Sequence, residues 1–395
     1  MAVAPPSRTL PWDTGRDTAV DLVRGVAVVC MVIAHVTIWV PETSGAVTLA
    51  LGLINNVASP LFALIMGVSS GIVLTRRRHP VTGTTFVLRN LVRGLIVIAI
   101  GIALEQLYSL IAIVLMSLGA TLVVAAPLAL LPLPTLTGVA AVTFVVGPFV
   151  NAAARGALDP SRVTSRAWLD QVLQWLLLSP HYRMVSLLPF VLIGVVLARV
   201  GLQRRAALAA LLTGVVAGVA VVALQLAGKG VGGPGHVSGS VPDALLDLTL
   251  AAGAFGVLVL LARWPAATPF VTALAPVRAV GALALTAYVL HVALIAFVLG
   301  TIAWPQIRED WLLLASGVLV GTVLACWLWW SLLGKGPIER LMALVTDPIG
   351  RADRDGVASF TAGDTAPDGR APVPCHHGRE HRSPHPSSRG DAPES

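Results

Sequence analysis

Charged side chains are scarce in this sequence. Only 12% of its 395 residues are Asp, Glu, Lys or Arg, and 56% are hydrophobic, whereas about 25% of residues are charged in soluble globular proteins. The mean hydropathy is +0.82. This composition excludes a soluble globular domain and predicts an integral membrane protein that crosses the bilayer several times.

Cysteines and familiar catalytic motifs are also lacking. The cysteines, Cys30, Cys326 and Cys375, are too few and too scattered for a disulfide framework or a thiolate metal site. There is no Walker loop, dinucleotide fingerprint, HExxH or GxSxG pattern. The C-terminal region does contain a histidine-rich group at Cys375, His376, His377, His381 and His385. Its spacing fits no four-ligand pattern, so we expect no metal.

Long apolar runs are what the sequence has in abundance. A helix of about 20 apolar residues spans a hydrocarbon core of about 30 Å. About ten such runs occur, at 20–40, 55–75, 87–107, 109–131, 134–152, 183–201, 206–227, 243–262, 279–301 and 311–333. The expected fold class is therefore all-α, a polytopic membrane helix bundle of about ten transmembrane helices.

The chain divides into three expected parts. Residues 1–19 form a polar N-terminal lead without a signal-cleavage site, so the first apolar run is expected to remain as a span. Residues 20–345 form the transmembrane domain. Residues 346–395 are rich in Pro, Gly, Ser, Asp and Arg and have almost no large apolar side chains, which predicts a disordered tail.

Lysines and arginines indicate the orientation. They gather in alternate loops, at Arg8, Arg16, Arg76, Arg77, Arg78, Arg199, Arg204, Arg205, Arg263, Arg278, Lys335 and Arg340. The positive-inside rule assigns these loops and both termini to the cytoplasm, and it also explains the net charge of +7. No basic stripe interleaved with aromatic residues is present, so we expect no nucleic-acid partner.

The first apolar run carries three ionisable residues, Asp21, Arg24 and His35. Ionisable side chains inside a membrane indicate function by default. Asp21 and Arg24 are close enough on a helix to pair, so they are either a topology anchor or a site for an anionic group from the cytoplasm. His35 lies about 21 Å from Asp21 along the helix axis. It is either a hydrogen-bonded structural residue or a general base for a hydroxyl or amine.

A second histidine lies at a comparable depth in the ninth run. His291 follows Tyr288 by three residues, so the two side chains share one helix face. They either pack in the interior or present an imidazole and a hydroxyl to one cavity. His181 and Tyr182 in the fifth connection resemble an interfacial segment with aromatic anchors, the alternative being a lid over an outer cavity.

Basic residues also gather between the second and third runs, at Arg76, Arg77, Arg78, His79, Arg89 and Arg93. This cluster fits the positive-inside rule and contact with anionic membrane lipid. It also fits phosphate oxygens, which guanidinium groups bind well. Coenzyme A carries such phosphates.

Several segments resemble a known family of membrane enzymes. Residues 20–25 (Val-Asp-Leu-Val-Arg-Gly), followed by His35, and residues 59–71, with Met-Gly-Val-Ser-Ser-Gly at their end, resemble the catalytic region of heparan-α-glucosaminide N-acetyltransferases and related bacterial transmembrane acyltransferases. Residues 281–291 and 336–340 (Gly-Pro-Ile-Glu-Arg) resemble the C-terminal signature of a bacterial sister group of largely undefined function.

The resemblance implies transfer of an acyl group, usually acetyl, from cytoplasmic acyl-CoA to a sugar or glycolipid acceptor on the other side of the membrane. Lysosomal members use a histidine in the loop after the first span, and this chain has none between Val36 and Asn56. His35 is the nearest replacement.

The resemblance and the residues together give candidate roles. Asp21, Arg24, Arg89 and Arg93 are the candidates for binding acetyl-CoA or another acyl-CoA. The catalytic candidates are His35 as the base for the acceptor, and Tyr288 or His291 as the donor to the developing oxyanion.

Two other classes of function stay open. A carrier, or a lipid or glycan flippase, could use the same polar groups along a permeation path, although no inverted repeat relates the two halves. A noncatalytic scaffold would follow if the ionisable residues satisfied only one another. We expect a plasma-membrane location, with membrane lipid and a glycan or glycolipid acceptor as partners. The oligomeric state stays open, a homo-oligomer included.

Overall fold

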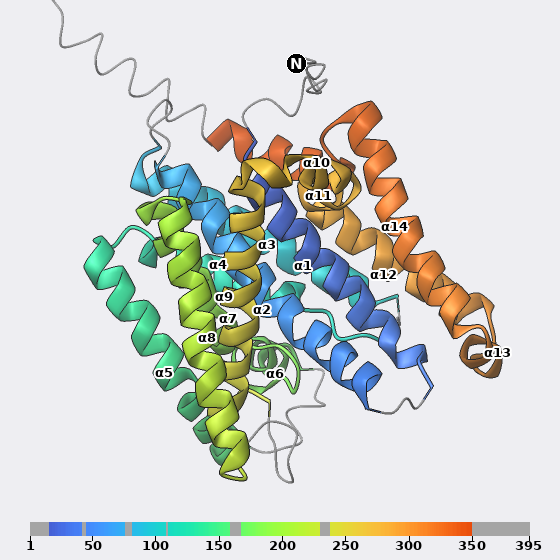
Figure 1. The fold of residues 1–395 in the computed structure, drawn as a ribbon, viewed down its shortest axis with the longest axis horizontal. Helices are drawn as coiled ribbons and strands as arrows, with labels where there is room; N and C mark the ends of the chain where they lie inside the picture. The colour runs from blue at the N-terminus through green and yellow to red at the C-terminus, as the bar shows by residue number, and fades with distance from the viewer. Residues whose placement is uncertain are drawn as a thin grey trace, which may run out of the picture. The chain divides into compact units, whose positions relative to one another are not determined.

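Helices make up the described part of the chain. The structure is a computed structural model, and it describes residues 16–41, 45–75, 81–107, 110–158, 167–229 and 238–349. Among these residues there is no strand. Figure 1 shows long helices packed side by side in a bundle. The expected all-α fold class is confirmed.

Ten apolar helices build the bundle within the described residues. Eight are long and apolar enough to cross a membrane: α1 (Thr18–Val36, continued by the 3₁₀ turn η1, Thr37–Trp39), α2 (Ala46–Thr75), α3 (Gly83–Glu105), α5 (Leu133–Ala157), α8 (Arg204–Leu226), α9 (Val241–Arg263), α12 (Ala284–Thr301) and α14 (Trp311–Leu333). Two are shorter: α4 (Leu115–Leu128) and α7 (Met184–Val200). Helices satisfy their own backbone polar groups, as a bilayer requires. The chain is a multi-pass membrane protein.

Shorter helices connect these elements. They are α6 (Trp168–Leu173), the π-helical turn η3 (Gln174–Leu178), the 3₁₀ turn η4 (Pro265–Ala267), α10 (Thr268–Ala273), α11 (Ala275–Ala282) and α13 (Trp304–Glu309). Residues 337–349 are also helical, so helical structure continues past the boundary expected at residue 345. Figure 1 shows α6 and α10 at opposite ends of the bundle.

Three expected spans differ from the helices observed. The run 109–131 is helical only at Leu115–Leu128, because residues 110–114 form an apolar but non-helical segment in which Leu110 has a φ of 58°. Hydrophobicity alone does not distinguish such a segment from a helix. The run 279–301 is interrupted at Leu283, between α11 and α12. The second span begins at Ala46 rather than at residue 55.

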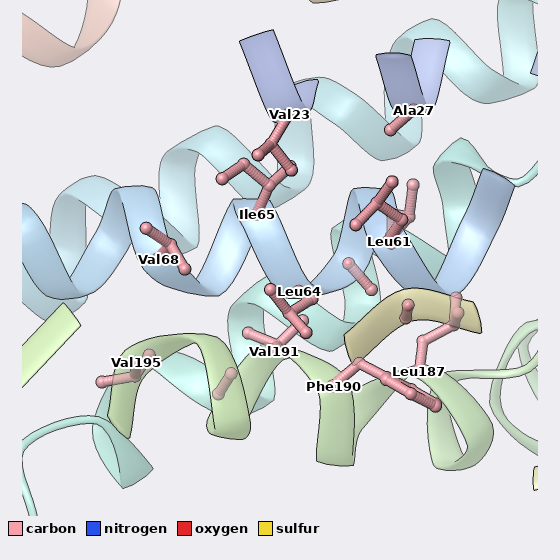
Figure 2. Packing of buried hydrophobic residues seen from close by; sticks show 14 of the residues in the cluster. Val23, Ala27, Leu61, Leu64, Ile65, Val68, Leu187, Phe190, Val191 and Val195 are labelled. Atoms are coloured by element: carbon pink, nitrogen blue, oxygen red, sulfur yellow. The ribbon is translucent and has the colours of Figure 1, made fainter. Parts of the chain in front are cut away.

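The first two helices lie at the centre of the bundle. In their most apolar stretches, 61% of α1 and 56% of α2 is buried, against 17% of α5 and of α14. Lipid chains are as apolar as leucine, so helices in a membrane associate through close packing. Figure 2 shows this packing, in which Leu61, Leu64, Ile65 and Val68 of α2 lie between Val23 and Ala27 of α1 and Leu187, Phe190, Val191 and Val195 of α7.

Glycines bring α1 and α11 into backbone contact. A Cβ at Gly25 would lie 2.0 Å from the carbonyl oxygen of Val277, and a Cβ at Gly281 would lie 1.9 Å from that of Asp21. Neither position has room for a side chain. Because α12 begins directly after α11, this contact also sets the position of α12 against α1.

Candidate active site

Two histidines from different helices meet in the interior. His35 lies in the last turn of α1 and His291 lies in α12, and their exposed fractions are 5% and 0%. His35 Nδ1 lies 2.9 Å from His291 Nε2. The rings are stacked, with centroids 5.1 Å apart. The two histidines expected at comparable depth therefore form a pair.

The hydrogen bonds around His291 indicate which nitrogens carry hydrogen. His291 Nδ1 lies 3.0 Å from the carbonyl oxygen of Ala287, which can only accept, so Nδ1 is the donor. In a neutral imidazole, His291 Nε2 is then an acceptor. It accepts a hydrogen bond from the N–H of His35 Nδ1. This tautomer, inferred from the network, leaves a lone pair on His35 Nε2. That atom is buried and has no hydrogen-bond partner among the described residues.

Tyr288 completes the cluster. Its hydroxyl oxygen accepts a hydrogen bond from the backbone N–H of Val114 at 3.3 Å, so its own hydrogen remains available to a further acceptor. The centroid of its ring lies 6.3 Å from that of His35 and 5.0 Å from that of His291, edge to face in both cases. All three candidate catalytic side chains therefore lie in one buried group.

His35 lines a cavity of about 650 Å³, here called the histidine cavity. The polar residues in its wall include Asn55, Asn56, Ser59, His181, Tyr182 and Asp247. Burial raises the pKa of the Tyr182 phenol, and the charge of Asp247 acts in the same direction, so this side chain remains a neutral hydroxyl. Amides, hydroxyls and carboxylates together can bind a molecule with several hydroxyl or amine groups.

Asp247 is a carboxylate within a membrane-spanning helix, α9. It makes no hydrogen bond or ion pair with any residue that the structure describes. Its neighbour Asp243, in contrast, accepts a hydrogen bond from the backbone N–H of Gly239 at 2.6 Å. An ionisable residue in this setting is a functional candidate. Asp247 was not among the residues expected from the sequence, although an acidic side chain inside an apolar run is a visible signal.

Tyr288 lines a second cavity, of about 280 Å³, here called the central cavity. Its wall is mostly apolar and comes from α2, α3, α4 and α12, among other elements. The polar side chains that line it include Arg24, Ser69, Asn90, Arg93 and Glu339. A cavity of this kind suits a slender chain with few charges.

A third and larger cavity, of about 1010 Å³, lies at the start of α1 and is here called the mouth cavity. Its arginines are Arg16, Arg24, Arg93, Arg204 and Arg263. Arg24, Ser69 and Arg93 line both the mouth and the central cavities. The Nε atom of Arg93 is buried without a hydrogen-bond partner among the described residues. Guanidinium groups arranged in this way suit the oxygens of a phosphate.

Asp21 is held chiefly by Arg16. Its two oxygens accept hydrogen bonds from Arg16 at 2.8 Å each, whereas Arg24 NH1 lies 3.5 Å from Asp21 Oδ1. Arg24 donates instead to the carbonyl oxygen of Gly281 at 3.1 Å and to the hydroxyl of Ser69 at 2.6 Å. Arg24 therefore links α1 to α2 and α11 at the junction of two cavities.

The other expected basic residues do not join this group. Arg89 pairs with Asp347 at 3.2 Å and lines none of the three cavities. The cluster at residues 76–79 and the histidine-rich group at 375–385 lie outside the described residues. Within the described ranges, no group of three or more His, Cys, Asp or Glu side chains could hold a metal ion.

Comparisons with known proteins match two ranges of the chain to families, and each range contains part of the candidate site. Residues 16–229 match the family described as heparan-alpha-glucosaminide N-acetyltransferase, catalytic, a range that includes Arg24 and His35. Residues 195–347 match a family described as a protein of unknown function, DUF418, a range that includes Tyr288 and His291. A comparison with curated proteins finds no match. Because the first match covers more than half of the chain, the chain belongs to the heparan-alpha-glucosaminide N-acetyltransferase catalytic family, a family of membrane acetyltransferases.

Proposed function

We propose that the protein transfers an acyl group, acetyl first of all, from acyl-CoA in the cytoplasm to a sugar or glycolipid on the other side of the membrane. The observation that carries this proposal is the position of the histidine pair. Tyr288 lines the central cavity and His35 lines the histidine cavity, and their ring centroids are 6.3 Å apart. A donor and an acceptor that enter from opposite ends would meet at this cluster.

The mouth cavity suits the donor. The phosphates of CoA are too highly charged to cross hydrocarbon unaided, and this cavity offers several arginines, with Arg93 poorly satisfied by the protein itself. The central cavity shares Arg24 and Arg93 and continues to Tyr288, which would let the pantetheine chain carry the thioester inward. The positive-inside rule assigns the arginine end to the cytoplasm.

The cluster supplies the groups that acyl transfer needs. The acceptor oxygen or nitrogen attacks the thioester carbonyl carbon, and its proton passes to His35 Nε2. The carbonyl oxygen becomes negative in the tetrahedral intermediate, and the Tyr288 hydroxyl donates a hydrogen bond to it. The C–S bond then breaks, and the departing CoA thiolate takes the proton from His35 Nε2. His291 holds the ring of His35 and stabilises its protonated form.

The histidine cavity suits an acceptor with several hydrogen-bond donors. The Asp247 carboxylate can accept from hydroxyl or amine hydrogens, and the amides of Asn55 and Asn56 can both donate and accept. Arg183 lines the same cavity as Asp243 and Asp247, so its wall carries charged side chains of both signs. We therefore propose a sugar with several free hydroxyl or amine groups as the acceptor.

Passage of a lipid or glycan without chemistry is less well supported. A permeating molecule would have to pass the level at which His35, Tyr288 and His291 pack against one another, where His291 is fully buried. The unsatisfied lone pair at His35 Nε2 is placed to accept a proton, as acyl transfer requires.

The test is transfer of label from radiolabelled acetyl-CoA to cell-envelope glycolipids by the purified protein. His35→Asn is the informative variant, because the asparagine amide can replace the Nδ1 donor toward His291 but offers no base at the position of Nε2. We expect labelled product from the wild type and from Arg308→Gln, an exposed control in α13, and none from His35→Asn. Absence of labelled product from the wild type with several acyl donors would contradict the proposal.

A further inference from the structure

The helix that carries Tyr288 and His291 begins at a break. α11 ends at Ala282 and α12 begins at Ala284, and Leu283 between them has φ −112° and ψ 37°. A break leaves carbonyl groups at the end of one helix, and N–H groups at the start of the next, without partners in their own helix. In the interior of a membrane protein such groups must find partners elsewhere.

Charged side chains from two other elements supply these partners. Glu339 Oε1 accepts hydrogen bonds from the backbone N–H groups of Leu285 at 2.9 Å and Thr286 at 3.1 Å. Glu339 Oε2 accepts from the Thr286 hydroxyl. Across the break, Arg24 donates to the carbonyl oxygen of Gly281 at 3.1 Å. Both charges have the favourable sign, because a helix is partially positive at its N-terminal end and partially negative at its C-terminal end.

Glu339 is itself held in place. It lies in the first turn of the helix at residues 337–349. Gly336, just before this helix, passes so close to α12 that a Cβ there would lie 2.5 Å from Thr286 Oγ1. Further along the same helix, Asp347 pairs with Arg89 of α3 at 3.2 Å. The helix at 337–349 therefore connects the break between α11 and α12 to α3.

We propose that Glu339 is a positioning residue, whose carboxylate fixes the first turn of α12 and thereby the alignment of Tyr288 and His291 with His35. The effect on catalysis rests on the acyl transfer proposed above. The two aligned side chains follow Leu285 by three and six residues, so they lie about 5 and 9 Å along the helix from the capped turn. Because a helix moves as a stiff unit, a shift of that turn displaces both.

The proposal gives a role to a segment of unexplained function. Residues 336–340, Gly-Pro-Ile-Glu-Arg, lie in the range that matches the family of unknown function, and so do Tyr288 and His291. The glycine allows close approach to Thr286, and the glutamate provides the cap. On this basis the C-terminal range supplies Tyr288 and His291, together with Glu339, which fixes their position.

The test compares Glu339→Ala and Glu339→Gln with Glu309→Ala, the loss of an exposed carboxylate in α13. Two quantities are measured on the full chain in detergent: amide hydrogen exchange in peptides that cover residues 284–292, and steady-state kinetics with acetyl-CoA as the varied substrate. In Glu339→Ala we expect exchange about tenfold faster or more, and kcat about 10- to 100-fold lower. Because Glu339 also lines the central cavity, the KM for acetyl-CoA is allowed to change, but by a smaller factor than kcat. Glu339→Gln keeps one acceptor oxygen, so its exchange rate and kcat should lie between those of the wild type and of Glu339→Ala. Both quantities should be unchanged in Glu309→Ala.

Several outcomes would overturn the proposal. Unchanged exchange in residues 284–292 of Glu339→Ala means that the carboxylate does not fix α12, and faster exchange with unchanged kcat means that the cap does not position the pair. If Glu339→Ala does not fold, Thr286→Val and Glu339→Gln are compared in the same way. If the wild type transfers no acyl group at all, the proposed function fails, and the exchange data alone decide whether Glu339 fixes α12.

Discussion

The reactive atom of this protein, on the mechanism proposed, is His35 Nε2. Its lone pair depends on a directed series of hydrogen bonds, from His35 Nδ1 to His291 Nε2 at 2.9 Å and from His291 Nδ1 to the Ala287 carbonyl at 3.0 Å. If His291 carried its hydrogen on Nε2 instead of Nδ1, it would donate to His35 Nδ1 and leave a hydrogen on His35 Nε2, the nitrogen that must act as base. His291 is therefore as important for the tautomer as for the orientation of His35.

Substitution of His291 should distinguish its hydrogen bond to His35 from its contribution to packing. In His291→Gln the amide oxygen can take the place of Nε2 and accept from His35 Nδ1, whereas His291→Leu offers no acceptor. We expect kcat to fall about 10²- to 10⁴-fold in His291→Leu and clearly less in His291→Gln. Initial rates at saturating acetyl-CoA measure the difference. Equal rates in the two variants would show that the hydrogen bond to His35 has no part in the reaction.

Arg93 should act on the donor alone. Its guanidinium lines both the mouth and the central cavities, and its Nε lacks a partner among the described residues. Charge-assisted hydrogen bonds contribute about 1.5–3 kcal/mol, so Arg93→Gln should raise the KM for acetyl-CoA about 10- to 100-fold with a smaller change in kcat. Arg308→Gln in α13 is the matched control. An unchanged KM in Arg93→Gln would remove Arg93 from the donor site.

Several residues of the candidate site are conspicuous in the sequence, because they stand in an apolar background. His35, His291 and Arg24 belong to this group, because an ionisable residue in an apolar run is conspicuous. Their partners were not predictable: Arg16 rather than Arg24 is the close partner of Asp21, and Arg89 pairs with Asp347. Side-chain pairing depends on which helix ends come together, and periodicity along one helix carries no such information.

Among the helices, the contact between α1 and α11 matters most for the site. It joins the helix of His35 to the break from which α12 starts, and it depends on Gly25 and Gly281. Small residues permit this approach, and in lipid close packing is what holds helices together.

Enlargement of Gly281 should therefore loosen the site. In Gly281→Ala the new Cβ would meet the Asp21 carbonyl oxygen at 1.9 Å, a backbone atom that moves only with its helix. Overpacking of this kind costs about 1–3 kcal/mol, and we expect a lower Tm in detergent together with reduced activity. Gly317→Ala in α14 is the control, because no atom lies within 4 Å of its new Cβ. Equal Tm values for the two variants would contradict the packing described.

The presence of helices was more predictable than their ends. Runs of about 20 apolar residues identify spans, and each of the ten expected runs overlaps an apolar helix, although only eight of the described helices are long enough to cross a membrane. The break at Leu283 leaves no mark in the local sequence, which contains neither proline nor a polar residue at 281–285. The groups that stabilise it come from Glu339 and Arg24, far away in the chain.

For the molecule as a whole, the arrangement of the cavities carries the functional argument. The mouth and central cavities share Arg24, Ser69 and Arg93, and the histidine cavity begins on the other side of the buried cluster, at His35. The two matched ranges each contribute part of the cluster. Neither range contains the whole proposed site, so the activity should require both.

The most direct test is the sidedness of transfer in sealed vesicles. The purified protein is reconstituted with glucosamine enclosed in the lumen and radiolabelled acetyl-CoA outside, after glucosamine has been compared with cell-envelope glycolipids as an acceptor in detergent. We predict that labelled N-acetylglucosamine accumulates inside the vesicles while labelled CoA derivatives stay outside, and that His35→Asn abolishes the product. Product that forms only when donor and acceptor are on the same side would contradict transfer across the membrane.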